Sequence, residues 1–475
     1  MTEMAAVILA AGEGKRMKSS RPKLLHRVAG RPLLWFPLDL AQRLDCARTV
    51  IVVGHGREQV TAAAQGMPGG DRLIFTVQQQ QRGTGDAVIA ALPALKGHAG
   101  PVLILSGDVP LIEKRSITRL RRAYERTGGP LAFLTFRPAD LTGYGRVIRD
   151  GDRPLAIRED RDCNRDEKRI AEVNAGIYLI DVRFLRRAVK QLQTNNAQGE
   201  LYLTDLVQHA AARKEVAAIE ASAEEVGGVN DRVDLARIEA VLRARTALRL
   251  MRAGVTFRQP GTVHVDLGVT VGADTELGPG VQLLGSTNIG RGCAIETGAV
   301  IVDSTVKDGA AVHAYSVVEQ AVVGREAEVG PLGRLRPGAV LKRGAKVGNF
   351  VELKNTVLGA GSKANHLAYL GDGDVGERVN VGAGTIFCNY DGFMKHRTVL
   401  EDEVFIGSDS QLVAPVTVGR AAYVASGSTI TKDVPADALA IARAKQENKP
   451  KVGAMLRKTL AAKKKRALAA KKDEK

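Results

Sequence analysis

The chain has 475 residues, of which 44% are hydrophobic and 25% are charged. This composition is typical of soluble globular proteins and excludes wholesale disorder, and the length predicts about three structural units. The sequence contains no uninterrupted apolar run of roughly 18 residues, the length that a membrane-spanning helix needs. Its 4 cysteines form no CxxC pair, so we expect neither a disulfide framework nor a zinc site, and a reducing, cytoplasmic location is favoured.

Much of the net charge of +17 lies at the C-terminal end. Residues 451–475 carry ten Lys/Arg and two Asp/Glu. The Lys/Ala-rich tail, residues 449–475, is most simply a solvated, partly helical segment. The alternative is that it contacts an anionic partner, such as nucleic acid or lipid headgroups. An aromatic content of 4% argues against nucleic-acid binding as the main function of the rest of the chain.

Apolar runs alternate with helical patterns in the first 228 residues. The predicted strands are residues 5–11, 49–53, 73–78, 102–105, 131–136 and 176–180, and residues 115–126 are one of the intervening helices. Strands that alternate with helices favour a mostly parallel α/β sheet. Ligands of such sheets bind at the carboxyl ends of the strands, which is where we look for chemistry.

A long helix is predicted over residues 229–253. This segment has neither Gly nor Pro, although Gly228 and Gly254 bracket it. Asn230 or Asp231 is a suitable N-cap. The helix would connect the α/β region to the C-terminal half of the chain.

From residue 254 onward, apolar residues recur at every sixth position. The repeat runs through Val265, Val271, Leu277, Leu283, Ile289, Ile295 and Ile301, resumes at Val323, Val329, Leu335, Leu341, Val347 and Leu353, and resumes again at Ile406, Leu412, Val418, Val424 and Ile430. Residues 254–430 also hold 28 of the 51 glycines. A hexapeptide repeat predicts short parallel strands wound into a β-helix of roughly nine coils. The repeat loses its phase between Phe387 and Ile406, which predicts a protruding loop of the kind that carries function.

A glycine-rich segment comes directly after the first predicted strand. In Gly12-Glu13-Gly14-Lys15-Arg16, the glycines would let backbone N–H groups approach phosphate oxygens, and the start of a helix would add positive potential. Met17 occupies the place of a third glycine, so this is not a dinucleotide-binding fingerprint, and no P-loop motif occurs in the sequence. Because Glu13 would repel a triphosphate, we expect its side chain to point to solvent.

Further motifs occur in a fixed order. The N-terminal set is Pro22-Lys23, Gln78-Gln79-Gln80-Gln81-Arg82-Gly83-Thr84-Gly85, Ser106-Gly107-Asp108, Gly143-Tyr144-Gly145-Arg146, Glu172-Val173-Asn174-Ala175-Gly176 and Gly228-Val229-Asn230. The C-terminal set is Arg334-Leu335-Arg336-Pro337-Gly338, Asn349-Phe350-Val351-Glu352-Leu353-Lys354, Asn365-His366-Leu367-Ala368-Tyr369, Asn380-Val381-Gly382-Ala383-Gly384-Thr385 and Cys388-Asn389-Tyr390-Asp391-Gly392. The first set resembles the sugar-1-phosphate nucleotidylyltransferases. With the hexapeptide repeat and the second set, the chain resembles the family that joins N-acetylglucosamine-1-phosphate uridylyltransferase to glucosamine-1-phosphate N-acetyltransferase.

The resemblance implies an architecture and a two-step function. It implies a Rossmann-like α/β nucleotidyltransferase domain over residues 1–228, a linker helix over 229–253, a left-handed parallel β-helix acetyltransferase domain over 254–448, and the basic tail. Acetyl-CoA would acetylate glucosamine 1-phosphate at the C-terminal site, and UTP with Mg²⁺ would convert the product to UDP-N-acetylglucosamine, releasing pyrophosphate. This product is a precursor of bacterial peptidoglycan and lipopolysaccharide. The resemblance also implies a homotrimer formed through the β-helix.

The resemblance also assigns residues to the nucleotide site. Asp108 follows a predicted strand, where a carboxylate is a good hard-oxygen ligand for Mg²⁺, and the resemblance adds Asn230 as its partner ligand. Arg16 and Lys23 would clamp the triphosphate. The remaining assigned positions are Leu9, Ala10, Ala11 and Gly12 around the nucleotide, Gln78, Gly83 and Thr84 at the uracil, and Gly145, Glu159, Asn174 and Thr84 at the amino sugar. No general base is needed, because the attacking sugar phosphate is already ionised near neutral pH.

The acetyltransferase site needs a group that accepts the proton of the attacking amine, and histidine suits that task. A lone histidine is more often structural, but His366 lies among residues that match the family's site, so the resemblance makes it the general base, with Asn389 orienting it or the substrate. The sugar phosphate would contact Arg336, Lys354, Tyr369, Asn380 and Lys395. Acetyl-CoA would contact Ala383, Asn389, Tyr390, Ser408, Ser426 and Arg443.

Two other functions are compatible with the same sequence. The first is a nucleotidylyltransferase of single activity, whose β-helix serves only to form oligomers. The second is a non-catalytic binding protein that docks on nucleic acid through its tail. The cluster of His366, Asn389 and Lys354 and the loop that breaks the repeat favour the bifunctional enzyme.

Overall fold

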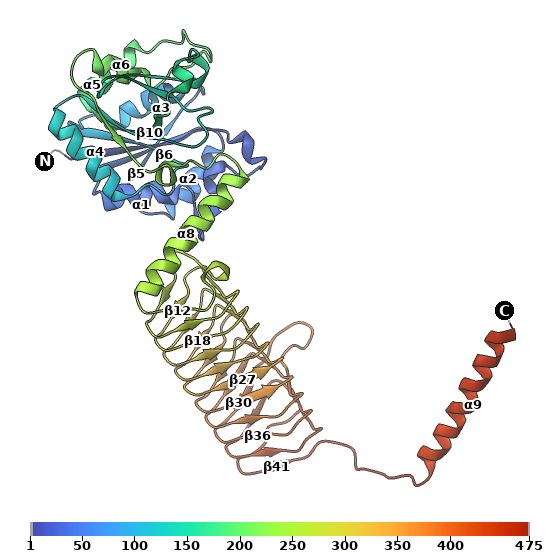
Figure 1. The fold of residues 1–475 in the computed structure, drawn as a ribbon. Helices are drawn as coiled ribbons and strands as arrows, with labels where there is room; N and C mark the ends of the chain where they lie inside the picture. Colours follow the sequence, from blue (N-terminus) through green and yellow to red (C-terminus); the bar gives the residue numbers. More distant parts are fainter. Residues whose placement is uncertain (1–2, 474–475) are drawn as a thin grey trace. The chain divides into compact units, whose positions relative to one another are not determined.

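The structure is a computed structural model that describes residues 3–473. The chain forms two compact units. Unit 1 comprises Met1–Ile289 with Val300–Asp303, and unit 2 comprises Gly290–Ala299 with Ser304–Lys475. Figure 1 traces both along the chain. No helix within residues 3–473 is long and apolar enough to cross a membrane.

Unit 1 is built on a nine-stranded sheet with the main order β11-β7-β10-β6-β1-β4-β5, from which β8 and β9 branch. Its strands are β1 (Ala5–Ala10), β4 (Arg48–Val53), β5 (Leu73–Val77), β6 (Pro101–Ser106), β7 (Leu131–Phe136), β8 (Arg146–Asp150), β9 (Arg153–Arg158), β10 (Val173–Asp181) and β11 (Ala217–Glu220). All six predicted strands are present. A separate antiparallel pair, β2 (Arg27–Val28) and β3 (Arg31–Pro32), was not predicted.

Most strands of the sheet run in the same direction. Strands β6, β1, β4 and β5 run parallel to one another. Strand β10 lies antiparallel between β6 and β7, and β8 and β9 form an antiparallel pair. The part of the sheet formed by β6, β1, β4 and β5 has the Rossmann-like arrangement that was expected. Strand β11 pairs parallel with β7, and because β10 is antiparallel to both β6 and β7, strands β7 and β11 run in the same direction as β6. The prediction of a mostly parallel sheet is therefore confirmed, and β10 is the one reversed strand of the main order, a direction that an apolar run does not reveal.

Helices cover both faces of the sheet. In β1, Ala5 and Val7 belong to one apolar core, whereas Ile8 and Ala10 belong to the other, as expected for a strand buried on both sides. The helices are α1 (Trp35–Arg43), α2 (Arg57–Gln65), α3 (Thr84–Ala91), α4 (Lys114–Thr127), α5 (Val182–Ala188), α6 (Asp205–Ala211) and α7 (Ala223–Val226). Buried residues of α1, α2 and α4 join the Ile8 core, and those of α3, α5 and α6 join the Ala5 core.

The predicted connecting helix is α8 (Arg232–Arg252). Of the two candidate caps, Asp231 is the one used, since its carboxylate accepts from the backbone N–H groups of Val233 (2.8 Å) and Asp234 (3.0 Å). Ile238 and Leu242 bury the helix against the core of unit 1. The helix is therefore anchored by packing, as well as by its cap.

The hexapeptide region forms a left-handed parallel β-helix, whose short strands stack in three sheets (Figure 1). Unit 1 holds β12 (Thr256–Phe257), β13 (His264–Val265), β14 (Thr270–Val271), β15 (Glu276–Leu277), β16 (Gln282–Leu284), β17 (Asn288–Ile289) and β19 (Val300–Val302). In unit 2 the first sheet contains β18 (Ala294–Ile295), β21 (Ala311–Val312), β24 (Glu328–Val329), β27 (Lys346–Asn349), β30 (Lys363–His366), β33 (Asn380–Val381), β36 (Phe405–Ile406), β39 (Tyr423–Val424) and β41 (Leu439–Ala440). The second contains β22 (Val317–Glu319), β25 (Arg334–Leu335), β28 (Glu352–Lys354), β31 (Tyr369–Gly371), β34 (Ile386–Cys388), β37 (Gln411–Val413) and β40 (Thr429–Ile430). The third contains β20 (Thr305–Val306), β23 (Val322–Val323), β26 (Val340–Leu341), β29 (Val357–Leu358), β32 (Gly373–Val375), β35 (Thr398–Leu400) and β38 (Val416–Val418).

The repeated apolar residues point into the β-helix. Val323, Leu353, Ile406 and Leu412 are completely buried. The predicted loop also leaves the stack where the repeat loses its phase. Hydrogen-bonded side chains on successive coils are typically 17 residues apart, as in Asn355 and Asp372, but the coil that contains the loop separates its hydrogen-bonded residues by 25.

The basic tail contains a helix, α9 (Val452–Asp473). Apart from the half-buried Val452, the side chains from Lys451 to Leu468 are exposed to solvent. The last two residues of the predicted tail lie outside the described part of the chain.

Packing inside the β-helix gives a first testable prediction. Replacing the fully buried Leu353 by Ala should lower the free energy of unfolding by about 2–5 kcal/mol, because the β-helix cannot close the cavity that is left. The same change at Leu439, which is 63% exposed, should alter it by less than about 0.5 kcal/mol. Urea unfolding followed by circular dichroism measures both. Equal losses for the two variants would contradict this account of the core.

Candidate active sites

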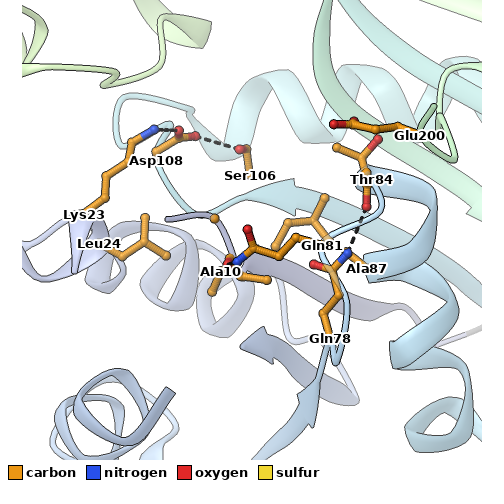
Figure 2. Close-up of a pocket in the computed structure, with 14 residues that line it drawn as sticks. Ala10, Lys23, Leu24, Gln78, Gln81, Thr84, Ala87, Ser106, Asp108 and Glu200 are labelled. Atoms are coloured by element: carbon orange, nitrogen blue, oxygen red, sulfur yellow. Dashed lines mark hydrogen bonds and ion pairs between the residues drawn. The ribbon is translucent and has the colours of Figure 1, made fainter. Parts of the chain in front are cut away.

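A cavity of about 330 Å³ opens at the carboxyl ends of β1 and β6 (Figure 2). Its walls combine the glycine-rich segment after β1, the segment around α3 and the end of β6. The lining residues are Leu9, Ala10, Ala11, Gly12, Lys23, Leu24, Gln78, Gln81, Gly83, Thr84, Ala87, Ser106, Asp108 and Glu200. The structure therefore brings together residues assigned to the nucleotide and the metal from four separate sequence motifs.

Parallel pairing explains why these motifs meet. Leu9 of β1 is in register with Ser106 of β6, and the N–H of Gly107 donates to the carbonyl oxygen of Leu9 (3.0 Å). A Cβ atom at Gly107 would lie 2.8 Å from that oxygen, so the close approach requires glycine. Asp108 is thereby placed beside the glycine-rich segment.

Both oxygens of the Asp108 carboxylate are held. Ser106 Oγ donates to Oδ1 (2.7 Å), and Lys23 Nζ forms an ion pair with Oδ2 (Figure 2). The Lys23 and Asp108 side chains are only 14% and 21% exposed. Because this pair is partly shielded from water, its attraction is stronger than that of a surface pair.

Asn230, the second predicted metal ligand, directly follows a residue that is hydrogen-bonded to Asp108. Its side chain, however, lines a neighbouring cavity. Val229 N donates to the carbonyl oxygen of Asp108 (2.9 Å), and Asn230 Oδ1 accepts from Arg16 (2.9 Å). Arg16 and Asn230 line a cavity of about 810 Å³ together with Tyr144, and not the cavity around Asp108. No group of three or more His, Cys, Asp or Glu suited to a metal occurs among residues 3–473.

The Asp108 carboxylate, as the protein oxygen ligand in this cavity, still suits Mg²⁺. This ion commonly takes one or two protein oxygens and completes its shell with water and substrate phosphates. The Lys23 ammonium on Asp108 shows that the structure already places a cation at this carboxylate. The donor set therefore fits a magnesium ion that arrives with phosphate oxygens.

Gln78, which is predicted to contact the uracil, is held in place by two side-chain hydrogen bonds. Its Nε2 donates to the carbonyl oxygen of Gly83 (3.0 Å) and to Asp86 (3.1 Å), and the side chain is buried. Since both donors of the amide are used, its Oε1 atom is left as an acceptor. An imide N–H, as in uracil, is a matching donor.

Five residues that line the cavity had no role assigned from the sequence, namely Leu24, Gln81, Ala87, Ser106 and Glu200. Gln81 Nε2 donates to the carbonyl oxygen of Ala11 (2.7 Å), which ties the glutamine run to the glycine-rich segment. Glu200 reaches the cavity from a loop far along the chain. Gln81 stands within a quoted motif, but nothing in the sequence around Glu200 singles it out.

Gly145, Glu159 and Asn174 are the residues predicted to contact only the amino sugar. They lie next to one another, outside the cavity around Asp108. Asn174 N donates to the carbonyl oxygen of Gly145 (2.8 Å), and a Cβ at Gly145 would lie 3.5 Å from the Glu159 carboxylate. Glu159 accepts from Thr204 (2.9 Å), and burial raises the pKa of the Glu159 carboxyl. None of the three lines the cavity around Asp108.

Glu13 points to solvent, as predicted. Its carboxylate pairs with Lys15 (2.7 Å) and is 39% exposed. The neighbouring Lys15 hydrogen bond lowers the pKa of Glu13. Glu13 does not line the cavity around Asp108, and lines instead a second cavity, to which Gln78 and Gln81 also contribute.

In unit 2, three of the five residues predicted to hold the sugar phosphate, Arg336, Lys354 and Tyr369, lie on the second sheet of the β-helix or next to it. Lys354 ends β28 and Tyr369 begins the adjacent β31. Contact with Lys395 from the loop, together with burial, lowers the pKa of the Lys354 ammonium. Arg336 pairs with Glu352 (2.8 Å). Cations this close together are a suitable site for a dianionic phosphate.

His366 lies at the end of β30, on a different sheet, and is exposed. Its Nδ1 lies 3.0 Å from Asn349 Oδ1. An amide oxygen can only accept, so Nδ1 carries the proton and Nε2 is left as the basic nitrogen. No hydrogen bond joins His366 to Asn389 in the described part of the chain.

Predicted coenzyme A positions lie along one corner of the last coils. Asp409 N donates to the carbonyl of Ala383 (2.7 Å), Gly427 N to that of Ser408 (2.8 Å), and Arg443 to that of Ser426 (2.6 Å). These bonds stack the four positions one above another. Tyr390 stands on the loop and is 60% exposed, while Asn380 begins β33 on the first sheet.

Two family models match successive parts of the chain. Residues 6–226 match a MobA-like NTP transferase domain, and residues 260–358 match a GMPPB C-terminal domain. A solved structure of UDP-glucose pyrophosphorylase complexed with UDP-glucose aligns with 52% of this chain and 100% of its own, with a TM-score of 0.41 and 17% identity. An NTP transferase domain whose cavity lies at the carboxyl edge of its sheet, followed by a left-handed β-helix, defines a nucleotidyltransferase with an added β-helix domain.

Relatives narrow the class to one family. The chain is 50% identical to the bifunctional protein GlmU of Sorangium cellulosum over 94% of its own length and 95% of the relative's, and 47% identical to that of Trichlorobacter lovleyi over 94% and 98%. The chain belongs to the GlmU family. It is a bifunctional enzyme of UDP-N-acetylglucosamine synthesis, with a uridylyltransferase N-terminal domain and an acetyltransferase C-terminal part. This disfavours the single-activity alternative.

Proposed function

We propose that the cavity around Asp108 transfers a uridylyl group from UTP to N-acetylglucosamine 1-phosphate, with Mg²⁺ held by Asp108 and Asn230. The observation that carries this proposal is the Asp108 carboxylate beside the glycine-rich segment, in the company of Lys23. A phosphate oxygen of the sugar attacks the α-phosphorus of UTP, and pyrophosphate leaves. Bound Mg²⁺ would neutralise charge on the transferring phosphates.

The chain's own residues supply position and charge in this reaction. Lys23 and Arg16 would hold the triphosphate, and the backbone of Leu9, Ala10, Ala11 and Gly12 would line its path. Gln78 Oε1 would accept from the uracil imide, beside Gly83 and Thr84. Gly145, Glu159 and Asn174 would contact the amino sugar. Fixed groups of this kind stabilise the developing charge without reorganising during the reaction.

We also propose that His366 is the base of acetyl transfer. Its Nε2 takes a proton of the glucosamine amine as that nitrogen attacks the thioester carbon, the C–S bond breaks, and the leaving thiolate takes up that proton from the imidazolium, so that coenzyme A leaves as the thiol. Asn389 would orient the reacting groups. Arg336, Lys354, Tyr369, Lys395 and Asn380 would hold the sugar phosphate, and the stacked corner with Tyr390 would bind acetyl-CoA.

A homotrimer in the cytoplasm is the assembly and location that we propose for this enzyme. Exposed apolar side chains support an interface through the β-helix, since they recur at one corner of successive coils as Tyr315, Leu332, Phe350 and Leu367. All four cysteines are free, in keeping with a reducing compartment.

Because the two proposed sites are separate, a substitution in one site should lower only the activity of that site. Asp108→Ala should lower uridylyl transfer by at least about a hundredfold and leave acetyl transfer unchanged. His366→Ala should lower acetyl transfer by about 10²- to 10⁴-fold and leave uridylyl transfer unchanged. Pyrophosphate release and free thiol report the two reactions in one preparation. If either substitution abolished both activities in folded protein, the two-site assignment would be wrong.

The Lys23–Asp108 pair predicts competition between the ammonium and the metal. Lys23→Gln should bind Mn²⁺ alone about fivefold more tightly than the unmodified protein, because removing a partly shielded pair frees the carboxylate, and it should bind UTP more weakly. Titration of Mn²⁺ by electron paramagnetic resonance measures the first effect. Lys15→Gln, which removes a lysine paired with Glu13 instead, is the matched control. Unchanged Mn²⁺ affinity in Lys23→Gln would show that no such competition exists.

For the tail, we propose nucleic acid as the anionic partner. Consecutive residues of an α-helix point about 100° apart, so the run Lys463–Arg466 directs cations to every side of α9. A flat lipid surface can meet only part of such a helix, whereas the phosphates of a duplex groove flank it on both sides.

Salt dependence tests the tail proposal. Duplex RNA or DNA should bind the full chain, and replacing the four residues Lys463–Arg466 by Gln should lower the slope of log K against log salt by about 3 to 4. Gel shifts between low and moderate salt measure this, and both enzymatic activities should stay unchanged. Binding to anionic vesicles in place of nucleic acid would refute the choice of partner.

A further inference from the structure

A carboxylate that the family resemblance did not bring forward lies beneath the acetyltransferase site. Asp372 stands between β31 and β32, is 8% exposed and has a left-handed backbone conformation with φ of 52°. Its N–H donates to the carbonyl oxygen of Lys354 (2.9 Å), and its own carbonyl oxygen accepts from Thr398 N (3.2 Å). The side chain is therefore held in a fixed place by backbone bonds to the coil on either side.

Two asparagine amides donate to this carboxylate. Asn355 Nδ2 donates to Oδ1 (2.7 Å), and Asn389 Nδ2 donates to Oδ2. Burial by itself would raise the pKa of Asp372, but these two hydrogen bonds and the charges of Lys354 and Lys395 hold it below the ordinary value. The carboxyl is therefore ionised at neutral pH and can only accept hydrogen bonds.

Because the Asp372 carboxylate can only accept hydrogen bonds, it determines the orientation of the Asn389 amide. Asn389 must present its NH₂ group to Asp372, because a carbonyl oxygen in that place would meet another oxygen. Its backbone is held as well, by N–H donation to Phe387 O (2.9 Å) and by acceptance from His396 N (2.8 Å). No described residue donates to Asn389 Oδ1, which is left as an acceptor.

We propose that Asp372 is a positioning residue for acetyl transfer, which locks the Asn389 amide so that its oxygen is presented to the N–H groups of the substrate. This inference rests on the proposed role of Asn389. Holding an acceptor in place in advance lowers the cost of orienting the amine for attack.

Charge balance is the competing explanation for this carboxylate. Asp372 lies close enough to Lys354 and Lys395 for their charges to act on it. If its role were only to offset these ammonium groups, removing its charge would alter the binding of the sugar phosphate and would leave the chemical step unchanged. The two roles are therefore separable as effects on kcat and on KM.

The test compares three variants of the full chain, with acetyl transfer followed by release of free thiol. Asp372→Asn should lower kcat by about tenfold or more, because an amide at 372 can accept from or donate to Asn389 and so no longer fixes it. Asn355→Gly removes the other hydrogen bond to the same carboxylate, and glycine suits the φ of 47° at that position. It should keep kcat within about twofold of the parent, as expected of a change remote from the reacting groups.

The third variant exchanges the two side chains. In Asp372→Asn combined with Asn389→Asp, the amide at 372 can accept from Asn355 and donate to the carboxylate at 389, which still presents an oxygen to the substrate. We expect this double variant to recover a substantial part of the kcat lost in Asp372→Asn. Uridylyl transfer, measured on each preparation, should stay at the parent level and confirms that the chain is folded.

Several results would overturn the inference. These are an unchanged kcat in Asp372→Asn, a rise in KM for glucosamine 1-phosphate as its only effect, equal losses of kcat in Asp372→Asn and Asn355→Gly, or no recovery in the double variant. Asn389→Ala separates this inference from the proposed function. If Asn389→Ala leaves acetyl transfer intact, the proposed role of Asn389 fails, whereas a loss there with none in Asp372→Asn rejects Asp372 alone.

Discussion

A carboxylate held between a cation and a neutral donor organises each of the two sites. In unit 1, Asp108 lies between the Lys23 ammonium and the Ser106 hydroxyl. In unit 2, Asp372 receives two amides and lies near Lys354 and Lys395. A partly buried charge is tolerated only where such partners compensate for lost hydration. The partners that offset the free-energy cost of burying these carboxylates also fix the orientation of each carboxylate. Reactions that depend on positioning require such fixed groups.

The two scaffolds achieve this placement by different means. In the α/β sheet, parallel neighbours end at the same edge, so the segments after β1 and β6 meet although they are far apart in sequence. In the β-helix, each coil places its residues directly above those of the coil before, as in the pairing of Glu352 with Tyr369. The sheet brings different motifs to one edge, whereas the β-helix builds its site by stacking. The sheet places Asp108 just beyond the end of β6, and the β-helix places Lys354 and His366 at the ends of β28 and β30. Asn389 and Lys395, by contrast, come from the loop at residues 389–397.

The six-residue period predicted the β-helix well, because each inward position must be small enough and apolar enough to fill a narrow interior at every coil. The loop at residues 389–397 was predicted for the same reason, since a lost phase has to leave the stack. The sheet of unit 1 was predicted less completely. Strand β10 reads as an ordinary buried run, and only its pairing with β6 and β7 shows that it is antiparallel. Residues such as Glu200 and Asp372 carry no local signal, because their significance comes from neighbours distant in sequence.

The sequence alone determined the kinds of structure and the family: alternating strands and helices, a repeat that must wind, a glycine-rich segment after the first strand, and motifs that resemble those of one bifunctional family. These features depend on local spacing and residue type, which act over a few neighbours. Only the tertiary structure decided that Lys23 pairs with Asp108 and that Arg16 and Asn230 line an adjoining cavity. It also decided that the Asn389 amide donates a hydrogen bond to Asp372. Such contacts depend on strand direction, register and the stacking of coils, which are set by the packing of the whole chain.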